Sequence, residues 1–191
     1  MKVFGIGLNK TGTTTLGKCF THFGYKHQSF DLGLMKHVSR GELEPVFDFV
    51  DEYDSFEDWP WPLIYEELDD HYPNSKFILT TRKDSSTWFE SLRRHSERTG
   101  PTEFRKIAYG YEMPHGHESD HIEVYERHNG EVRDYFSDSN DLLEVCWETG
   151  SGWKELCNFL NETEPDIPFP HANKGDGLLK STLRSIKDSL T

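Results

Sequence analysis

The chain has 191 residues, of which 34 are acidic and 21 basic, and its formal net charge is -13. This surplus of negative charge would repel a nucleic-acid backbone, so we expect no DNA or RNA partner. The aromatic content of 14% indicates a chain that folds around an aromatic core, and the length fits a single domain over residues 1–191.

Membrane and secretory segments are not expected in this sequence. No apolar run approaches the roughly 20 residues that span a bilayer, and a strand pattern begins near the first residue. The three cysteines, Cys19, Cys146 and Cys157, lack the spacing of a metal site and are expected to be buried, reduced thiols within helices or strands. We therefore expect a cytoplasmic protein with no membrane partner.

Hydrophobic patterning predicts a strand, a glycine loop and a helix at the N-terminus. The run VFGIGL over residues 3–8 is typical of a strand that is covered on both faces. From Thr13, apolar residues recur at helical spacing as far as Phe23, and Gly24 is a signal for the end of the helix.

The rest of the chain alternates between expected helices and strands. Two short surface helices are expected between residues 31 and 53, and a helical lid or insertion at about residues 95–140. Further strands are expected at residues 54–57, 76–81 and 142–146, and further helices at residues 63–71, 85–98 and 153–160. This alternation predicts an α/β three-layer sandwich, with a central parallel sheet of about four to five strands flanked by helices. Ligands of such folds bind beyond the carboxyl ends of the strands.

The segment Gly5–Leu16, GIGLNKTGTTTL, has the composition of an anion-binding loop. It leads into a helix N-terminus, where unpaired backbone N–H groups and the positive end of the helix dipole favour negative charge. Gly7 and Gly12 permit close approach of the backbone, and Lys10 adds a positive charge. Further hydroxyl donors are Thr11, Thr13, Thr14 and Thr15. The combination predicts a phosphate or sulfate site, and the alternative is a tight turn with a solvated lysine.

The loop differs from the P-loop of nucleoside triphosphatases. In that motif, GxxxxGK[ST], a lysine directly follows the second glycine, whereas this chain has Thr13 there and its lysine at position 10. No predicted strand clearly ends in the aspartate that would complete a Mg²⁺ site. A P-loop nucleotide or small-molecule kinase is therefore the weaker alternative.

A lysine ahead of a Thr-Gly-Thr-Thr run resembles the loop by which sulfotransferases hold the 5′-phosphosulfate of 3′-phosphoadenosine 5′-phosphosulfate (PAPS). Residues 57–92 resemble the second block of that family, in which an arginine at a strand end and a serine on the next helix bind the 3′-phosphate. Arg82 and Ser91 match these two positions. Residues 142–160 are similar to the segment that precedes the family's C-terminal cofactor loop. The pattern is closest to a compact bacterial-type branch, with a P-loop NTPase-like fold.

Two segments depart from the family's pattern. The interval from Arg82 to Ser91 is one residue longer than usual, so Ser86 or Thr87 could share the role of Ser91. Near the C-terminus, the segment around Lys174 approximates the basic, glycine-containing loop of the family, and we assign Lys174 to cofactor binding.

The resemblance implies in-line transfer of a sulfuryl group from PAPS, without a metal, to a hydroxyl or amine of a small-molecule or glycan acceptor. Lys10 would stabilise negative charge on the leaving oxygen. The residues from Thr11 to Thr15 would hold the 5′ end, and Arg82 would pair with the 3′-phosphate.

The acceptor must lose a proton, which requires a general base. Asp58 follows the second predicted strand beside Trp59 and Trp61, whose rings would exclude water and raise its pKa. Its alternative role is that of N-cap for the helix after Pro60. Further candidates for the base are Glu57, His95 and His27.

Other readings concern the lid and the activity as a whole. His115, His117 and His121 lack the fixed spacing of metal ligands, and a solvated acidic loop explains them better.

A noncatalytic relative that binds an anionic nucleotide is the third functional alternative. A homodimer is one possible assembly, because the chain is short and the lid is expected to be exposed.

Overall fold

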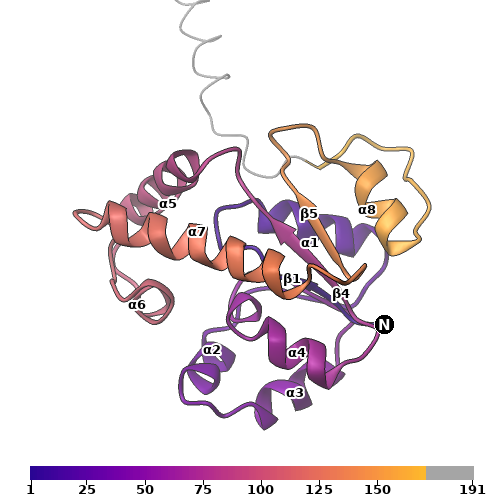
Figure 1. Ribbon diagram of the computed structural model, residues 1–191, viewed down its shortest axis with the longest axis horizontal. Helices are drawn as coiled ribbons and strands as arrows, with labels where there is room; N and C mark the ends of the chain where they lie inside the picture. Colours follow the sequence, from indigo (N-terminus) through magenta and orange to yellow (C-terminus); the bar gives the residue numbers. More distant parts are fainter. Residues whose placement is uncertain (171–191) are drawn as a thin grey trace, which may run out of the picture.

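The computed structural model describes residues 1–170, and its centre is a five-stranded sheet in which all neighbouring strands run parallel (Figure 1). The strands are β1 (Val3–Gly5), β2 (His27–Gln28), β3 (Ser55–Phe56), β4 (Lys76–Thr80) and β5 (Leu142–Val145), in the spatial order β2-β3-β1-β4-β5. The predicted α/β sandwich with a parallel sheet of four to five strands is confirmed. Lys174 lies outside the described residues.

The helices match the predicted alternation closely. They are α1 (Thr13–His22), α2 (Leu32–Ser39), α3 (Glu44–Asp51), the 3₁₀ helix η1 (Trp61–Leu63), α4 (Tyr65–His71), α5 (Ser85–Thr99), α6 (Glu103–Tyr109), α7 (Glu118–Tyr135) and α8 (Trp153–Leu160). None of those within residues 1–170 has the length and apolar character needed to cross a bilayer.

Alternating side chains of the strands build a core on each face of the sheet. Phe4, Phe56 and Phe77 point to one face, where their rings stack and where α3, α4 and α7 cover them. Val3 and Ile78 point to the other face and pack against α1 and α8. Because both faces are covered, the central strands β1 and β4 carry apolar side chains on both sides, as expected for a parallel sheet.

A third apolar cluster lies beyond the carboxyl ends of the strands. Leu8 meets Trp59, from the loop after β3, and side chains from α2, α5, α6 and α7, including Trp88, Tyr109 and Tyr125. This cluster supports the loop that follows β1, and the helices of residues 95–140 supply much of it. It therefore couples the expected lid to the edge of the sheet where ligands bind.

Two details differ from the sequence-based expectation. The edge strand β2 was not predicted, because it has two residues, both polar and partly exposed, and therefore no hydrophobic pattern. Cys146 lies one residue beyond β5 and is partly buried, whereas Cys19 and Cys157 are buried as expected, and all three thiols are free.

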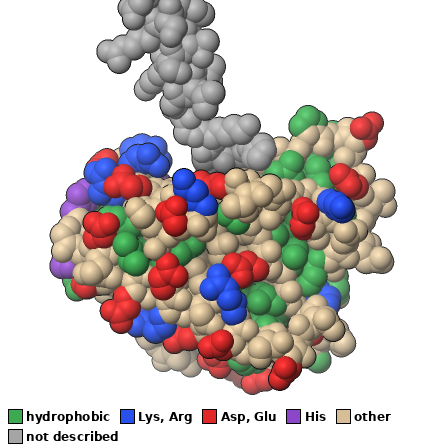
Figure 2. Space-filling view, turned by 45° about the horizontal axis from the view of Figure 1, so that its top comes forward, with side chains coloured by type: hydrophobic (Ala, Val, Ile, Leu, Met, Phe, Trp, Pro, Cys, Tyr) green, Lys and Arg blue, Asp and Glu red, His purple; other side chains and the backbone are tan. Residues whose placement is uncertain are grey.

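Acidic and basic side chains are interspersed on the face shown in Figure 2. Many charged side chains of the described residues are paired, as in the bidentate contacts between Arg133 and Glu144 and the helical pairs that Arg93 makes with Glu90 and Glu97. Basic side chains are therefore largely balanced locally by acidic ones.

Candidate functional site

The loop between β1 and α1 needs both of its glycines. A side chain at Gly7 would collide with the backbone of Thr80 on β4. Gly12 has φ of 103°, in the left-handed region, and a side chain there would collide with the indole of Trp147. Among the described residues, no side chain caps the N-terminus of α1, and its first turn holds no acidic residue. The loop therefore leaves the positive end of α1 available to an anion.

The four threonine hydroxyls of the loop point to different surroundings. Thr11 is buried, donates to the Leu8 carbonyl at 2.6 Å, and lies 2.5 Å from the Thr80 hydroxyl. Thr13 is buried and its hydroxyl bonds to the Asp58 carboxylate. Thr15 is also buried, whereas Thr14 is exposed. Thr14 thus carries the hydroxyl of this run that is exposed to solvent.

Lys10 and Asp58 both adopt left-handed backbone conformations, with φ of 72° and 67°. Non-glycine residues rarely do so, and such conformations concentrate at functional sites. The other two positive-φ residues that are not glycine within residues 1–170 are Asn74 and Asn161, and asparagine tolerates this region well. The two unusual conformations thus lie at the two residues predicted to be catalytic.

Asp58 lies two residues beyond the end of β3, and most of its surface is covered by protein. Burial is the main cause that raises its pKa, to about 7, and the charge of Glu57 adds to the shift. The Trp59 backbone N–H donates to Asp58 Oδ1 at 2.9 Å, and the Lys10 ammonium also favours the carboxylate. The N-cap alternative is wrong, because Pro60 precedes η1 and its N-terminus has no side-chain cap among the described residues.

The Lys10 ammonium interacts electrostatically with Asp58, with Arg98 of α5 and with Arg82. Burial lowers its pKa most, followed by the charge of Arg98, while the charge of Asp58 opposes this effect. His95, one turn before Arg98, has a pKa lowered to about 4 by burial and by the charges of Lys10, Arg105 and Arg98. The ends of β1 and β3 and the middle of α5 therefore meet at one place.

The remaining base candidates, Glu57 and His27, point toward α1. Glu57 is buried and accepts a hydrogen bond from Ser29 Oγ at 2.5 Å, and its carboxylate lies 3.7 Å from His27 Nε2. Gly17 of α1 makes room for both side chains. The structure thus separates two neighbouring carboxylates, with Asp58 on the Lys10 side and Glu57 behind it.

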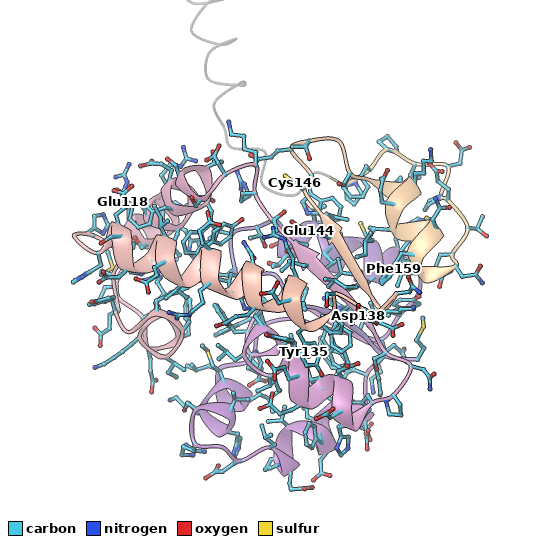
Figure 3. All side chains as sticks on the ribbon, viewed as in Figure 1. Glu118, Tyr135, Asp138, Glu144, Cys146 and Phe159 are labelled. Carbon is cyan, nitrogen blue, oxygen red and sulfur yellow. The ribbon has the colours of Figure 1, made fainter. Side chains whose placement is uncertain are left out.

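Arg82 lies just beyond β4, at the position predicted for the 3′-phosphate contact. Its guanidinium makes two hydrogen bonds to the Glu148 carboxylate, at 2.9 Å through Nε and at 2.6 Å through Nη2. Its third nitrogen, Nη1, donates to the Lys10 carbonyl at 3.2 Å. Glu148 follows β5, beyond Glu144 and Cys146, which are labelled in Figure 3. Arg82 therefore joins the ends of β1, β4 and β5.

The serine and threonine candidates lie along α5. Ser91 is half-buried and stands one turn before His95, on the helix face that turns toward Lys10. Ser86 is exposed, while Thr87 bonds to Asp84, the N-cap of α5, through both its backbone and its hydroxyl. Thr87 is thus engaged in capping, whereas Ser91 shares a helix face with His95.

Several residues around the loop were not singled out from the sequence. The Asn9 side chain accepts from the Tyr109 hydroxyl at 2.6 Å, and the Asn9 carbonyl accepts from Trp88 Nε1 at 2.9 Å. Trp147 Nε1 donates to the Gly12 carbonyl at 3.2 Å. Trp147 and Glu148 directly follow the strand expected at residues 142–146, and site residues were expected beyond the strand ends. Their position after this strand could therefore have identified them as candidates. Tyr109 lies within the expected lid and had none.

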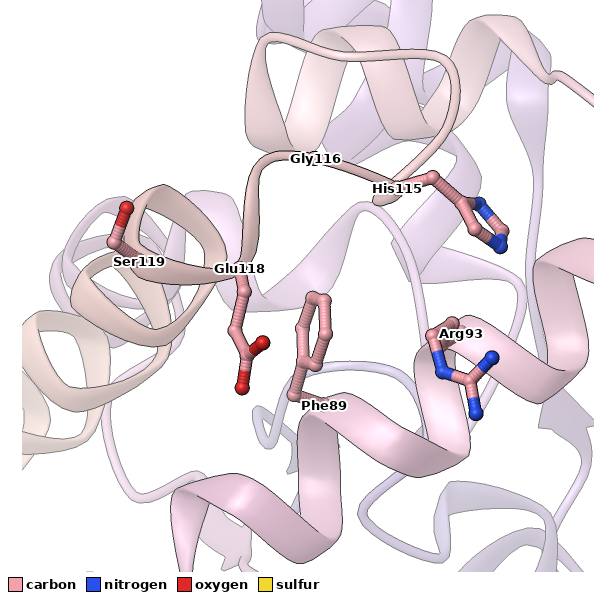
Figure 4. Close-up of a pocket in the computed structure, with 6 residues that line it drawn as sticks. All are labelled: Phe89, Arg93, His115, Gly116, Glu118 and Ser119. Atoms are coloured by element: carbon pink, nitrogen blue, oxygen red, sulfur yellow. The ribbon is translucent and has the colours of Figure 1, made fainter.

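A separate hollow of about 580 Å³ opens between α5 and the start of α7. Figure 4 shows Phe89 and Arg93 of α5 facing His115 and Glu118 across it. Arg93 is already paired with acidic residues, and none of the predicted site residues line this hollow. Within residues 1–170, no three His, Cys, Asp or Glu side chains are grouped as metal ligands.

The chain is similar to a known protein family and to a fungal protein. A family profile described as a sulfotransferase domain matches residues 2–111 and 100–178. A protein of Aspergillus versicolor named "Ava biosynthesis cluster protein M" is 29% identical over 225 aligned positions, which cover 95% of this chain and 84% of that protein.

Proposed function

The chain belongs to the sulfotransferase domain family, and on this premise we propose that it moves a sulfuryl group from PAPS to a hydroxyl or amine of a small-molecule or glycan acceptor. The observation that carries the proposal is the meeting of Lys10 and Asp58 beyond β1 and β3. A cation beside an anion-binding loop and a carboxylate with a pKa of about 7 are the two groups that such a transfer needs.

The residues present fit the 5′ end of the donor. The N-terminus of α1 is uncapped by side chains within the described residues, and Gly12 removes the side chain that would obstruct it. Thr14 adds an exposed hydroxyl. PAPS, when bound, supplies the sulfuryl group and a phosphate oxygen that leaves with negative charge.

Lys10 is the residue that we propose to stabilise the leaving group. Its ammonium would stabilise the negative charge that develops on the leaving oxygen. Burial and the charge of Arg98 lower its pKa, which makes its proton easier to donate as that charge grows. The hydrogen bond from Arg82 to its carbonyl helps to fix the backbone from which the side chain extends.

Asp58 is the proposed general base. A base works best when its pKa lies near the operating pH, and that of Asp58 is about 7. His95 also lies near Lys10, but its pKa of about 4 makes it a weak base. Glu57 points toward α1 and is held by Ser29, so its role is to raise the pKa of Asp58. Asp58 is therefore the stronger candidate.

The acceptor would approach from the side of α5 and α6. Trp59, Trp88 and Tyr109 are buried in the apolar cluster there, and their rings exclude water from the neighbourhood of Asp58. We place the reaction in the cytoplasm, where the three free thiols would stay reduced.

Calorimetric titration with adenosine 3′,5′-bisphosphate (PAP), the product nucleotide, tests the proposal. We expect saturable binding without Mg²⁺, and sulfuryl transfer from labelled PAPS to at least one member of a panel of phenols, amines and sugars. ATP with Mg²⁺ is the comparison for the kinase alternative. Absence of any response to PAP at millimolar concentration would refute the proposal, and PAP binding without transfer would favour the noncatalytic alternative.

A further inference from the structure

The contact between Arg82 and Glu148 closes the position that the 3′-phosphate is expected to take. Two nitrogens of Arg82 face two oxygens of Glu148, which is the paired geometry by which arginine also binds phosphate. The Lys83 backbone N–H donates to the same carboxylate at 3.2 Å. One anionic group thus already collects three hydrogen bonds from this strand end.

Resting on the function proposed above, we infer that Glu148 is an internal substitute for the 3′-phosphate. Its carboxylate holds Arg82 in place without nucleotide and gives the guanidinium up when the phosphate binds. Glu148 is accordingly a positioning residue that lowers affinity for nucleotides with a 3′-phosphate. It does not touch the reacting atoms.

Exposure at this pair permits such an exchange. The side chains of Arg82 and Glu148 are 20% and 33% exposed, so solvent and ligands reach them without unfolding. Glu148 lies in the turn after β5, outside regular structure, whereas Arg82 is also tied to the Lys10 carbonyl. The carboxylate is therefore the partner that can move, and the guanidinium is the partner that stays.

Charge gives the exchange its direction. A phosphate dianion attracts Arg82 more strongly than a carboxylate does. While Glu148 stays in place, however, its carboxylate neutralises the charge of Arg82 and repels an approaching phosphate. Removal of this carboxylate charge therefore favours nucleotides with a 3′-phosphate. Nucleotides without that phosphate do not use Arg82 and are not expected to respond.

The test compares PAP with adenosine 5′-monophosphate (AMP), which lacks the 3′-phosphate, by calorimetry on the full chain. We expect Glu148→Gln to bind PAP roughly tenfold more tightly, while its affinity for AMP stays within about twofold of the wild-type value. Glu148→Ala is the second variant and should behave alike. Melting temperatures of both check that the fold is kept.

Glu144→Gln is the matched control. Glu144 lies on β5, four residues before Glu148, and makes the same kind of bidentate contact with Arg133, at 2.8 and 2.7 Å. Its variant should bind both nucleotides as the wild type does.

Two results would overturn the inference while PAP still binds the wild type. Unchanged or weaker PAP binding by both Glu148 variants would show that Glu148 orients Arg82 for the ligand. An equal gain for PAP and AMP would show a general effect of net charge. Failure of the proposed function looks different, because PAP then binds neither the wild type nor any variant, and the inference falls with it.

Discussion

The two ends of the proposed nucleotide site are built in opposite ways. On the Lys10 side, no side chain of the described residues caps the N-terminus of α1, and the Thr14 hydroxyl is exposed. On the Arg82 side, every nitrogen of the guanidinium already has a protein acceptor. A ligand at the first end adds hydrogen bonds, whereas a ligand at the second end exchanges them. Most of the binding free energy of a nucleotide should therefore come from the Lys10 side of the site.

Lys10→Ala tests this difference most severely. We expect sulfuryl transfer to fall on the order of a hundredfold or more, because the developing charge loses its cationic partner. Initial rates with labelled PAPS measure the effect. Lys18→Ala, on the exposed surface of α1, is the matched control and should keep full activity. A Lys10→Ala enzyme with nearly normal rates would place catalysis elsewhere.

Asp58→Asn separates chemistry from binding. We expect kcat/KM to fall roughly a hundredfold, since general bases commonly contribute this much, while PAP affinity changes little. In the wild type, kcat/KM should rise with pH through about 7, and the variant should lose this rise. Asp70→Asn on α4 is an exposed control. An unchanged pH profile in Asp58→Asn would exclude Asp58 as the base.

The raised pKa of Asp58 also predicts how stability depends on pH. Between about pH 4 and pH 7 the folded protein keeps a proton that the unfolded chain has released, so this group lowers the free energy of unfolding as pH rises. Asp58→Asn should therefore be more stable than the wild type at pH 8, by roughly 1–3 kcal/mol, and about equally stable near pH 4. Urea unfolding at both pH values measures this, and an equal difference at both would contradict it.

The smallest expected effects compare two threonines of one loop. Thr11→Val removes a hydroxyl that bonds to Leu8 and Thr80, and should lower the free energy of unfolding by about 1 kcal/mol. Thr14 is exposed, so Thr14→Val should change the free energy of unfolding by less than about 0.5 kcal/mol and should weaken PAP binding instead. Equal destabilisation by both would show that the hydroxyls do not differ in role.

Much of the fold could be predicted, because helical and apolar periodicities in this chain are long and regular. The strands expected at residues 76–81 and 142–146 and the two short helices between residues 31 and 53 are all present. The strand β2 escaped prediction, since a two-residue polar edge strand depends on pairing with β3 rather than on its own sequence.

The site could be predicted only in part. A local pattern reveals Lys10 and its glycines, because a single turn of chain determines what the loop can hold. The partner of Arg82 lies 66 positions away, and no local pattern reveals which carboxylate meets it. Burial also redirected Thr11 and Thr13, whose hydroxyls turn toward Thr80 and Asp58. Such choices follow from packing of distant segments.

Asn9 has a consequence for how such an enzyme changes its preferences. Asn9 directly precedes Lys10. Its side chain accepts a hydrogen bond from Tyr109 of α6, and its carbonyl accepts one from Trp88 of α5. Under the proposed function, replacing these helices to admit a different acceptor would therefore displace the donor-binding loop as well. Engineered swaps of α5 and α6 should then keep Trp88 and Tyr109, because these two residues hold Asn9.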